Sequence, residues 1–316
     1  MRVAGTVCEV YPLEHYVAKG YKVVEWDGEI VFFFQTYHLT VICISGKTAM
    51  PFVNSEQHVF QVFAGQPREL SWETDCQQLY NVIHDEFSKV KNYPEKYLHH
   101  KRGDYRTLDV GVTCGQGNQT ITNRHLSCKL QTLAENLMGL CLLQRVLWHV
   151  ESCHWMWAPN LQAYVQRYVC KLFKKPHFRK HLRRISPKSF YICASPNDGP
   201  TAYTIQHRDD MNLAFGWCAI VALGQFDHTR GGHLVFDDLH LAVEFPPNSI
   251  VLLPSAMLYH CNVPVRENEQ CASLTFYNPA SIFQYIDNGF MTEKQLWKNN
   301  HSRFMELQHR KPTRYL

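Results

Sequence analysis

Three residues of this 316-residue chain have the types and spacing of a mononuclear iron site. His207 and Asp209 are two residues apart in a strand-like stretch. Alternate side chains of a strand point to the same side, so this imidazole and this carboxylate can reach one metal ion. His260, far downstream, is the candidate for the third ligand. Two histidines and one carboxylate around iron(II) leave coordination positions open for substrates, as in non-haem oxygenases.

A His-x-Asp pair alone is weak evidence, because chance supplies such pairs in a chain with 18 histidines. The residues around the pair strengthen this evidence. Gly231-Gly232 marks a turn between the two histidines, and an apolar run ended by Pro254 precedes His260. This spacing is the one that a jelly roll imposes on ligands from distant strands.

The second half of the chain reads as a series of strands. Short apolar runs bounded by Gly, Pro, Asn or Asp predict strands at 190–194, 203–208, 218–223, 233–236, 241–245, 250–253 and 272–277. Strands of this length and spacing are typical of a β-sandwich or jelly roll.

The first half must support that core. Residues 1–70 read as short irregular strands, including runs at 30–34 and 39–44, followed by a helix from Ser71 to about Lys91 and a loop over 92–124. Leucines at three- and four-residue steps predict one long helix over 126–147, and Pro159 opens another. The predicted fold is therefore α+β, a double-stranded β-helix core buttressed by N-terminal helices.

We divide the chain into an irregular β segment at 1–54, one main domain at 55–290 and a basic C-terminal tail at 291–316. Within the main domain, helical support occupies about 71–188 and the β-helix core about 189–280.

Composition narrows the class of protein. The chain is 45% hydrophobic and 19% charged, which is typical of a globular protein. We find no apolar run long enough to span a bilayer and no signal-peptide pattern. The 12 cysteines are scattered without a Cys-x-x-Cys pair, which favours a reduced, intracellular compartment.

The positive charge is concentrated in one place. Fifteen residues contain seven basic side chains and no acid: Lys174, Lys175, Arg179, Lys180, Arg183, Arg184 and Lys188. Such a cluster can follow the phosphates of a nucleic acid, or it can be a solvated helix face. The sequence leaves both interpretations open.

Ordered motifs over about residues 55–290 resemble the fungal TET/JBP-like dioxygenases, relatives of the enzymes that oxidise 5-methylcytosine in DNA. The matching stretches include Gly115-Gln116-Gly117-Asn118, Trp157-Ala158-Pro159, His207-Arg208-Asp209-Asp210-Met211-Asn212, Arg230-Gly231-Gly232-His233 and His260-Cys261-Asn262-Val263-Pro264. The resemblance implies an Fe(II)- and 2-oxoglutarate-dependent oxygenase with DNA as its partner.

The resemblance also implies roles for single residues. His207, Asp209 and His260 match the iron ligands. Asn212 matches a residue near the target base, and Tyr277 an aromatic position that can stack on a flipped base. Ordinary turn and strand roles remain open for Asn212 and Tyr277, as does strand packing for Ser273, which matches a serine near the 2-oxoglutarate carboxylate.

One position departs from the family. The arginine that clamps the distal carboxylate of 2-oxoglutarate, two residues before that serine, is Cys271 here. A neutral thiol cannot replace a bidentate arginine–carboxylate pair, so we expect weak binding of 2-oxoglutarate in a largely apolar pocket. Arg266 and Arg230 are the candidates to take over the role.

The expected function is oxidation of a modified base of the 5-methylcytosine type in DNA, in an intracellular and nuclear protein. The basic residues Lys174 to Arg184 would then contact phosphates. Two alternatives stay open because of Cys271. One is a degenerate, transposon-associated relative that binds DNA and metal with little turnover. The other is an oxygenase of the same fold with another substrate or reductant.

Overall fold

The structure is a computed structural model that describes residues 10–24, 29–31, 41–43, 49–115, 117–199 and 201–314. The strand-like runs predicted at 30–34 and 39–44 lie only partly within these ranges, where residues 29–31 and 41–43 form the short hairpin β2 (Glu29–Val31) and β3 (Val41–Cys43).

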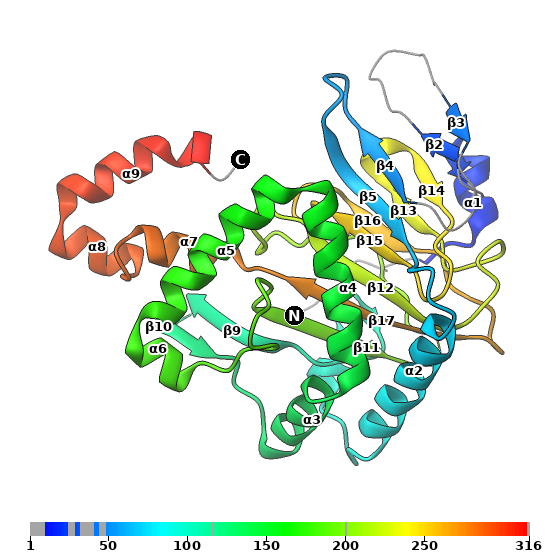
Figure 1. Cartoon of the computed structure of the whole chain (residues 1–316), viewed down its shortest axis with the longest axis horizontal. Coiled ribbons are helices and arrows are strands. Elements are labelled where there is room, and N and C mark those ends of the chain that lie inside the picture. The colour runs from blue at the N-terminus through cyan, green and yellow to red at the C-terminus, as the bar shows by residue number, and fades with distance from the viewer. Residues whose placement is uncertain are drawn as a thin grey trace.

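A nine-stranded sheet forms the centre of the molecule (Figure 1). Its strands run in the order β10-β9-β11-β17-β12-β15-β5-β4, and β8 also pairs with β11. Every pairing in it is antiparallel. The strands are β4 (Met50–Val53), β5 (Val59–Gly65), β8 (Arg106–Thr107), β9 (Val110–Gly115), β10 (Asn118–Asn123), β11 (Cys193–Asp198), β12 (Cys218–Gln225), β15 (Ile250–Leu253) and β17 (Gln270–Tyr277).

A smaller sheet faces the central strands. It has the order β1-β14-β13-β16, with β1 (Lys22–Val24), β14 (Leu241–Val243), β13 (Leu234–Phe236) and β16 (His260–Asn262). Phe63 of the large sheet meets Phe236 of the small one edge to face, 6.2 Å between ring centroids. The two packed sheets form a double-stranded β-helix, so the predicted fold class is confirmed.

Helices cover the outer side of the large sheet (Figure 1). They are α2 (Trp72–Ser88), α3 (Cys128–Met138), α4 (Cys141–Trp157), α5 (Pro159–Lys174) and α6 (Pro176–His181). In α2 the buried side chains Trp72, Cys76, Leu79, Ile83 and Phe87 recur at helical spacing, because that face packs on the sheet.

The single helix predicted over 126–147 is wrong. It is broken between α3 and α4 at Gly139, a residue with low helix propensity. The side-chain amide of Gln144 donates to the carbonyl of Met138 and so satisfies a backbone group that the break leaves open. The helix predicted from Ser71 starts as expected but ends at Ser88, three residues before Lys91.

The loop predicted over 92–124 is also wrong. It contains the 3-10 turn η1 (Glu95–Tyr97), the small hairpin β6 (His99–His100) and β7 (Gly103–Asp104), and then β8, β9 and β10. Gly111 has φ +121° and lies so close to β11 that a Cβ would come within 2.3 Å of the Ile192 carbonyl oxygen. This close approach brings β9 into the large sheet, one strand away from β17.

Most of the predicted strands of the core are present, with two differences. Residues 203–208 form no regular strand and pair with β16 through a single bridge between His207 and His260. The strand predicted at 190–194 is shifted towards the C-terminus, as β11. The other elements of this part are the 3-10 turn η2 (Asp237–Leu239) and, near the N-terminus, helix α1 (Leu13–Ala18).

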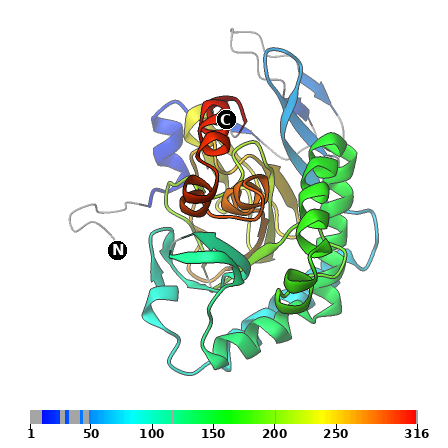
Figure 2. The same ribbon diagram turned by 90° about the vertical axis from the view of Figure 1, so that its left-hand side faces the viewer.

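The basic C-terminal stretch is helical: α7 (Ala280–Asp287) is followed by α8 (Glu293–Asn299) and α9 (His301–Arg314). Figure 2 shows these helices in front of the sheet, beside the β9–β10 hairpin. Thr292 caps α8 by accepting from the Gln295 amide nitrogen, and the Gln295 side chain accepts in return. Within the described ranges, no helix combines the length and the apolarity that a transmembrane span requires.

Candidate metal centre and its cavity

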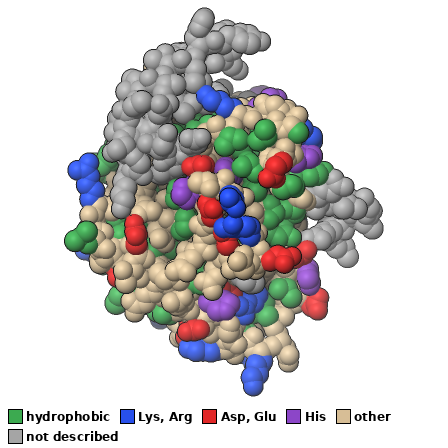
Figure 3. All heavy atoms as spheres, turned by 90° about the vertical axis from the view of Figure 1, so that its right-hand side faces the viewer, with side chains coloured by type: hydrophobic (Ala, Val, Ile, Leu, Met, Phe, Trp, Pro, Cys, Tyr) green, Lys and Arg blue, Asp and Glu red, His purple; other side chains and the backbone are tan. Residues whose placement is uncertain are grey.

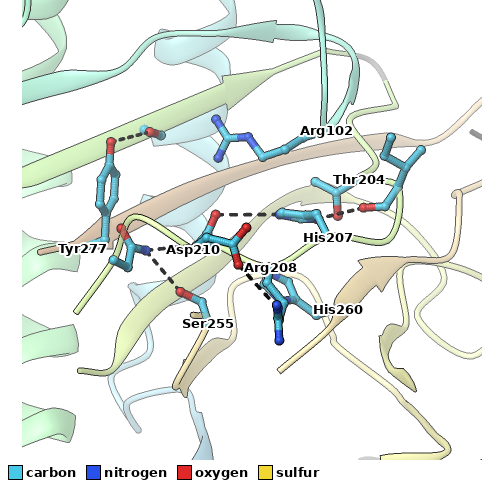
Figure 4. Close-up of polar contacts among 12 residues, drawn as sticks. Arg102, Thr204, His207, Arg208, Asp210, Ser255, His260 and Tyr277 are labelled. Atoms are coloured by element: carbon cyan, nitrogen blue, oxygen red, sulfur yellow. Dashed lines mark hydrogen bonds and ion pairs between the residues drawn. The ribbon is translucent and has the colours of Figure 1, made fainter. Parts of the chain in front are cut away.

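His207 and His260 face each other across two neighbouring chain segments (Figure 4). Each backbone amide donates to the carbonyl of the other residue, at 3.0 and 2.9 Å. Thr204 extends this pairing, because its hydroxyl donates to the Asn262 side chain at 2.7 Å and its carbonyl accepts from the Asn262 amide. The two imidazole rings are 4.4 Å apart between centroids.

Hydrogen bonds fix which nitrogen of each ring is free for a metal. Nδ1 of His207 lies 2.8 Å from the carbonyl of Ile205, and Nδ1 of His260 lies 2.9 Å from that of Leu258. A carbonyl only accepts, so both Nδ1 atoms carry the proton and both Nε2 atoms present a lone pair. Burial, and then the neighbouring His260, lower the pKa of His207, which keeps its ring neutral as a metal ligand must be.

Asp209 is the third candidate metal ligand. One ligand atom from each of His207, Asp209 and His260 lies within 4.8 Å of the other two, and these three form the only such group among the described residues. The Asp209 amide donates to the Ser255 carbonyl at 2.9 Å, which ties the segment after His207 to the end of β15. Two neutral imidazoles and one carboxylate fit iron(II).

Asn212 lies against this centre. Its amide nitrogen is 3.4 Å from Asp209 Oδ2 and 3.2 Å from Ser255 Oγ. It thus orients the carboxylate of a candidate metal ligand, in addition to lining the cavity described next.

A cavity of about 330 Å³ opens beside Asp209, one of the three candidate ligands. Asp209, Asn212, Tyr277 and Thr275 line it from the core, and residues of the 96–124 region line its other side. The predicted site residues Asn212 and Tyr277 therefore meet at one cavity with Asp209. Burial, and then Asp109, raise the pKa of Tyr277 well above its usual value, so its hydroxyl keeps its proton.

Two arginines that sequence reasoning missed also line this cavity. Arg102 Nη2 lies 3.8 Å from Asp109 Oδ1, and Arg124 Nη1 lies 3.6 Å from Asp109 Oδ2. Although burial opposes it, Tyr105, Asp109 and Asp209 hold the pKa of Arg102 above its ordinary value. Figure 4 shows the Arg102 side chain above His207 in this view, with its guanidinium group directed towards the side of Tyr277.

Ser273 and Cys271 lie on the face of β17 that also carries Thr275 and Tyr277. Ser273 Oγ accepts from the Asn197 amide at 3.0 Å, and Asn197 Oδ1 accepts from Thr107 Oγ1 at 2.6 Å. Burial raises the pKa of the Cys271 thiol to about 12, and neither Cys271 nor Ser273 lines the cavity that contains Asp209. Arg102 and Arg124 supply positive charge to that cavity.

The structure does not bring Arg266 and Arg230 to the site. Arg266 forms ion pairs with Glu269 and Asp227, and its side chain is 48% exposed. Arg230 is 69% exposed and pairs with Asp227 at 3.7 Å. Neither residue lines the cavity that contains Asp209.

The basic segment spreads over three elements rather than one helix face. It covers the end of α5, then α6, and the loop that follows, and its exposed members are Lys174, Lys175, Arg179, Lys180, Arg183 and Lys188. Arg184 is different: it donates to the Ser189 carbonyl and lies over the Phe173 ring. Figure 3, which views the side of the molecule away from α6, shows acidic and basic side chains interspersed there.

No protein-family model matches the chain, and no curated protein does. Among solved structures, the fold is similar to that of NgTET1 in complex with 5mC DNA, with a TM-score of 0.54, 10% sequence identity and coverage of 80% of this chain and 83% of that one. A 2OG-Fe(II) oxygenase-family oxidoreductase from Burkholderia pseudomallei aligns at a TM-score of 0.30, with 14% identity, over 67% of this chain and 93% of that one. A collagen prolyl hydroxylase of Paramecium bursaria Chlorella virus-1 aligns at 0.22, with 16% identity, over 27% and 57%. The last two scores are too low to support an inference.

Proposed function

We propose that this protein is an Fe(II)- and 2-oxoglutarate-dependent dioxygenase of the TET/JBP-like type that oxidises a modified base, of the 5-methylcytosine class, in DNA. The observation that supports this most is the arrangement of His207, Asp209 and His260, three ligand atoms within 4.8 Å of one another beside a cavity of about 330 Å³. The cavity has room for a small acid and for part of a base.

The three ligands would hold iron(II), and the bound metal would supply the oxidising chemistry with oxygen and a 2-oxo acid. The chain's own contribution is placement. The carbonyls of Ile205 and Leu258 keep Nε2 of both histidines available, and Asn212 holds the Asp209 carboxylate in place.

The proposed substrate follows from the fold and from charge. NgTET1, whose fold this chain shares, was solved with 5mC DNA. A base inside a duplex cannot reach a metal beneath a protein surface, so the target would have to be flipped into the cavity, where Tyr277 could stack on it and Asn212 could contact its edge. The exposed residues Lys174, Lys175, Arg179 and Lys180 would contact phosphates. We also propose a nuclear location, because duplex DNA is the substrate.

The test is Fe(II)-dependent consumption of 2-oxoglutarate, together with mass spectrometry of the DNA bases. Methylated and unmethylated duplexes of one sequence are compared, with His207→Ala as the matched inactive control. We expect base oxidation only with methylated DNA and intact ligands. Metal and DNA binding without oxidation would instead indicate a degenerate, transposon-associated relative. Oxidation supported by another reductant or on another substrate would indicate a different oxygenase of this fold.

A further inference from the structure

We propose that Arg102 and Arg124 together anchor the distal carboxylate of the 2-oxo acid, in place of the strand arginine whose position Cys271 occupies. This inference rests on the proposed function and names the residues that select its co-substrate. Both arginines come from the segment between α2 and α3, Arg102 from the turn between β6 and β7 and Arg124 from the residue after β10.

Arg102 is tied directly to the metal centre. Its carbonyl accepts from the Ile205 amide at 2.8 Å, and the Ile205 carbonyl accepts from His207 Nδ1 at the same distance. The adjoining Gly103 lies so close to this segment that a Cβ would come within 2.7 Å of the Tyr203 carbonyl oxygen. The turn between β6 and β7 therefore has a fixed position relative to His207.

Arg124 reaches the cavity from the end of β10. Its amide donates to the Gly111 carbonyl at 2.9 Å, which holds it beside β9. Its Nε is buried without a hydrogen-bond partner in the described part of the chain. A buried donor of this kind favours an acceptor that arrives with a ligand.

Asp109 lies between the two guanidinium groups but does not occupy all of their N–H donors. It accepts a hydrogen bond from the Ser195 hydroxyl and lies 3.8 and 3.6 Å from the two arginines. Both distances exceed hydrogen-bond length, so N–H groups remain available. One carboxylate between two guanidiniums leaves one surplus positive charge, and Asp209, the other carboxylate near Arg102, is a metal ligand.

The remaining charged residues of the cavity do not cancel this surplus. Asp210, whose side chain is 65% exposed, pairs with Arg208, and Lys96 and Lys101 add positive charge at the cavity mouth. Burial lowers the pKa of His100, which keeps that ring neutral. A second carboxylate on the ligand would therefore enter a positive environment, and a methyl group at the same place would gain nothing.

The test measures ligand preference rather than turnover. The full-length protein is loaded with Mn(II), without oxygen, and titrated calorimetrically with 2-oxoglutarate and with 2-oxopentanoate, which has a methyl group in place of the distal carboxylate. We expect the wild type to bind 2-oxoglutarate at least about tenfold more tightly. Arg102→Met and Arg124→Met should each lose most of that preference, while Arg102→Lys should retain part of it.

Binding of Mn(II) and of 2-oxopentanoate by each variant shows that its site is folded. Arg266→Met and Arg230→Met remove the same charge from exposed positions and should keep the full preference. A preference that survives in Arg102→Met and Arg124→Met would overturn the inference and leave the proposed function intact. Failure of the wild-type Mn(II) protein to bind either acid would overturn both.

Discussion

The side chain of Asn212 has two candidate roles, a contact to the proposed target base and a support for the candidate metal ligand Asp209. Asn212→Leu distinguishes them, because leucine keeps the size and removes the amide. Hydrogen-bond partners of metal ligands typically contribute roughly 10- to 100-fold to metal affinity. The contact to Asp209 Oδ2 is long, 3.4 Å, so we expect the lower end, about tenfold or about 1.4 kcal/mol.

The assay is a titration of Mn(II) into the wild type, Asn212→Leu and Ser255→Ala. Ser255→Ala is the matched control: it removes the hydroxyl that accepts from Asn212 but keeps the carbonyl that accepts from the Asp209 amide. It should cost less affinity than Asn212→Leu. An unchanged Mn(II) affinity in Asn212→Leu, combined with weaker binding of methylated DNA, would refute the support role and favour a base contact.

Three further outcomes are expected. Calorimetry should show no stoichiometric Mn(II) binding by any of the variants His207→Ala, Asp209→Ala and His260→Ala, while their circular dichroism spectra stay unchanged. A variant that keeps the wild-type affinity for Mn(II) would show that the substituted residue is not a ligand. Arg106→Met should lower the free energy of unfolding in urea by about 3 kcal/mol, because the fully buried Asp198, which lies between Arg106 and His84, loses its arginine partner. The double variant Arg106→Met/Asp198→Asn should recover part of this loss. An unchanged free energy of unfolding in Arg106→Met would mean that the ion pair is replaceable. We expect a decrease of about three in the slope of log DNA affinity against log salt when Lys174, Lys175, Arg179 and Lys180 are neutralised. Neutralising Lys89 and Lys91, the control, should leave the slope unchanged. An unchanged slope in both variants would mean that the basic segment is solvated surface.

The grouping of the three candidate metal ligands was predictable because their signal is local. The His-x-Asp spacing, the apolar run before His260 and the order of the surrounding motifs are all visible in the sequence, and the structure brings the three residues together. The β-helix core was predictable for the same reason, since most of its strands have turn residues at both ends. The irregular pairing of residues 203–208 was not, because it depends on the position of β16.

The arginines of the cavity were missed because the segment that contains them was interpreted as a loop. Arg102 and Arg124 reach the site only through pairings with distant strands, and no local spacing encodes that register. A signal for the hairpin was nevertheless present: two β-prone runs flank the Gly115–Asn118 turn. Likewise, Gly139 inside the leucine pattern marked the break between α3 and α4.

The pairing of His207 with His260 has a thermodynamic consequence. Residues 199–217, which join β11 to β12, contain no regular strand in their described part and are held near β16 and β17 by scattered hydrogen bonds. A metal ion bound by His207, Asp209 and His260 would act as a cross-link between this connection and β16. Because such an ion binds only the folded arrangement, free metal at a hundred times its dissociation constant would add about 2.7 kcal/mol to stability. A chelator should therefore first increase local opening, with proteolytic nicking within 199–217, before global unfolding becomes measurable.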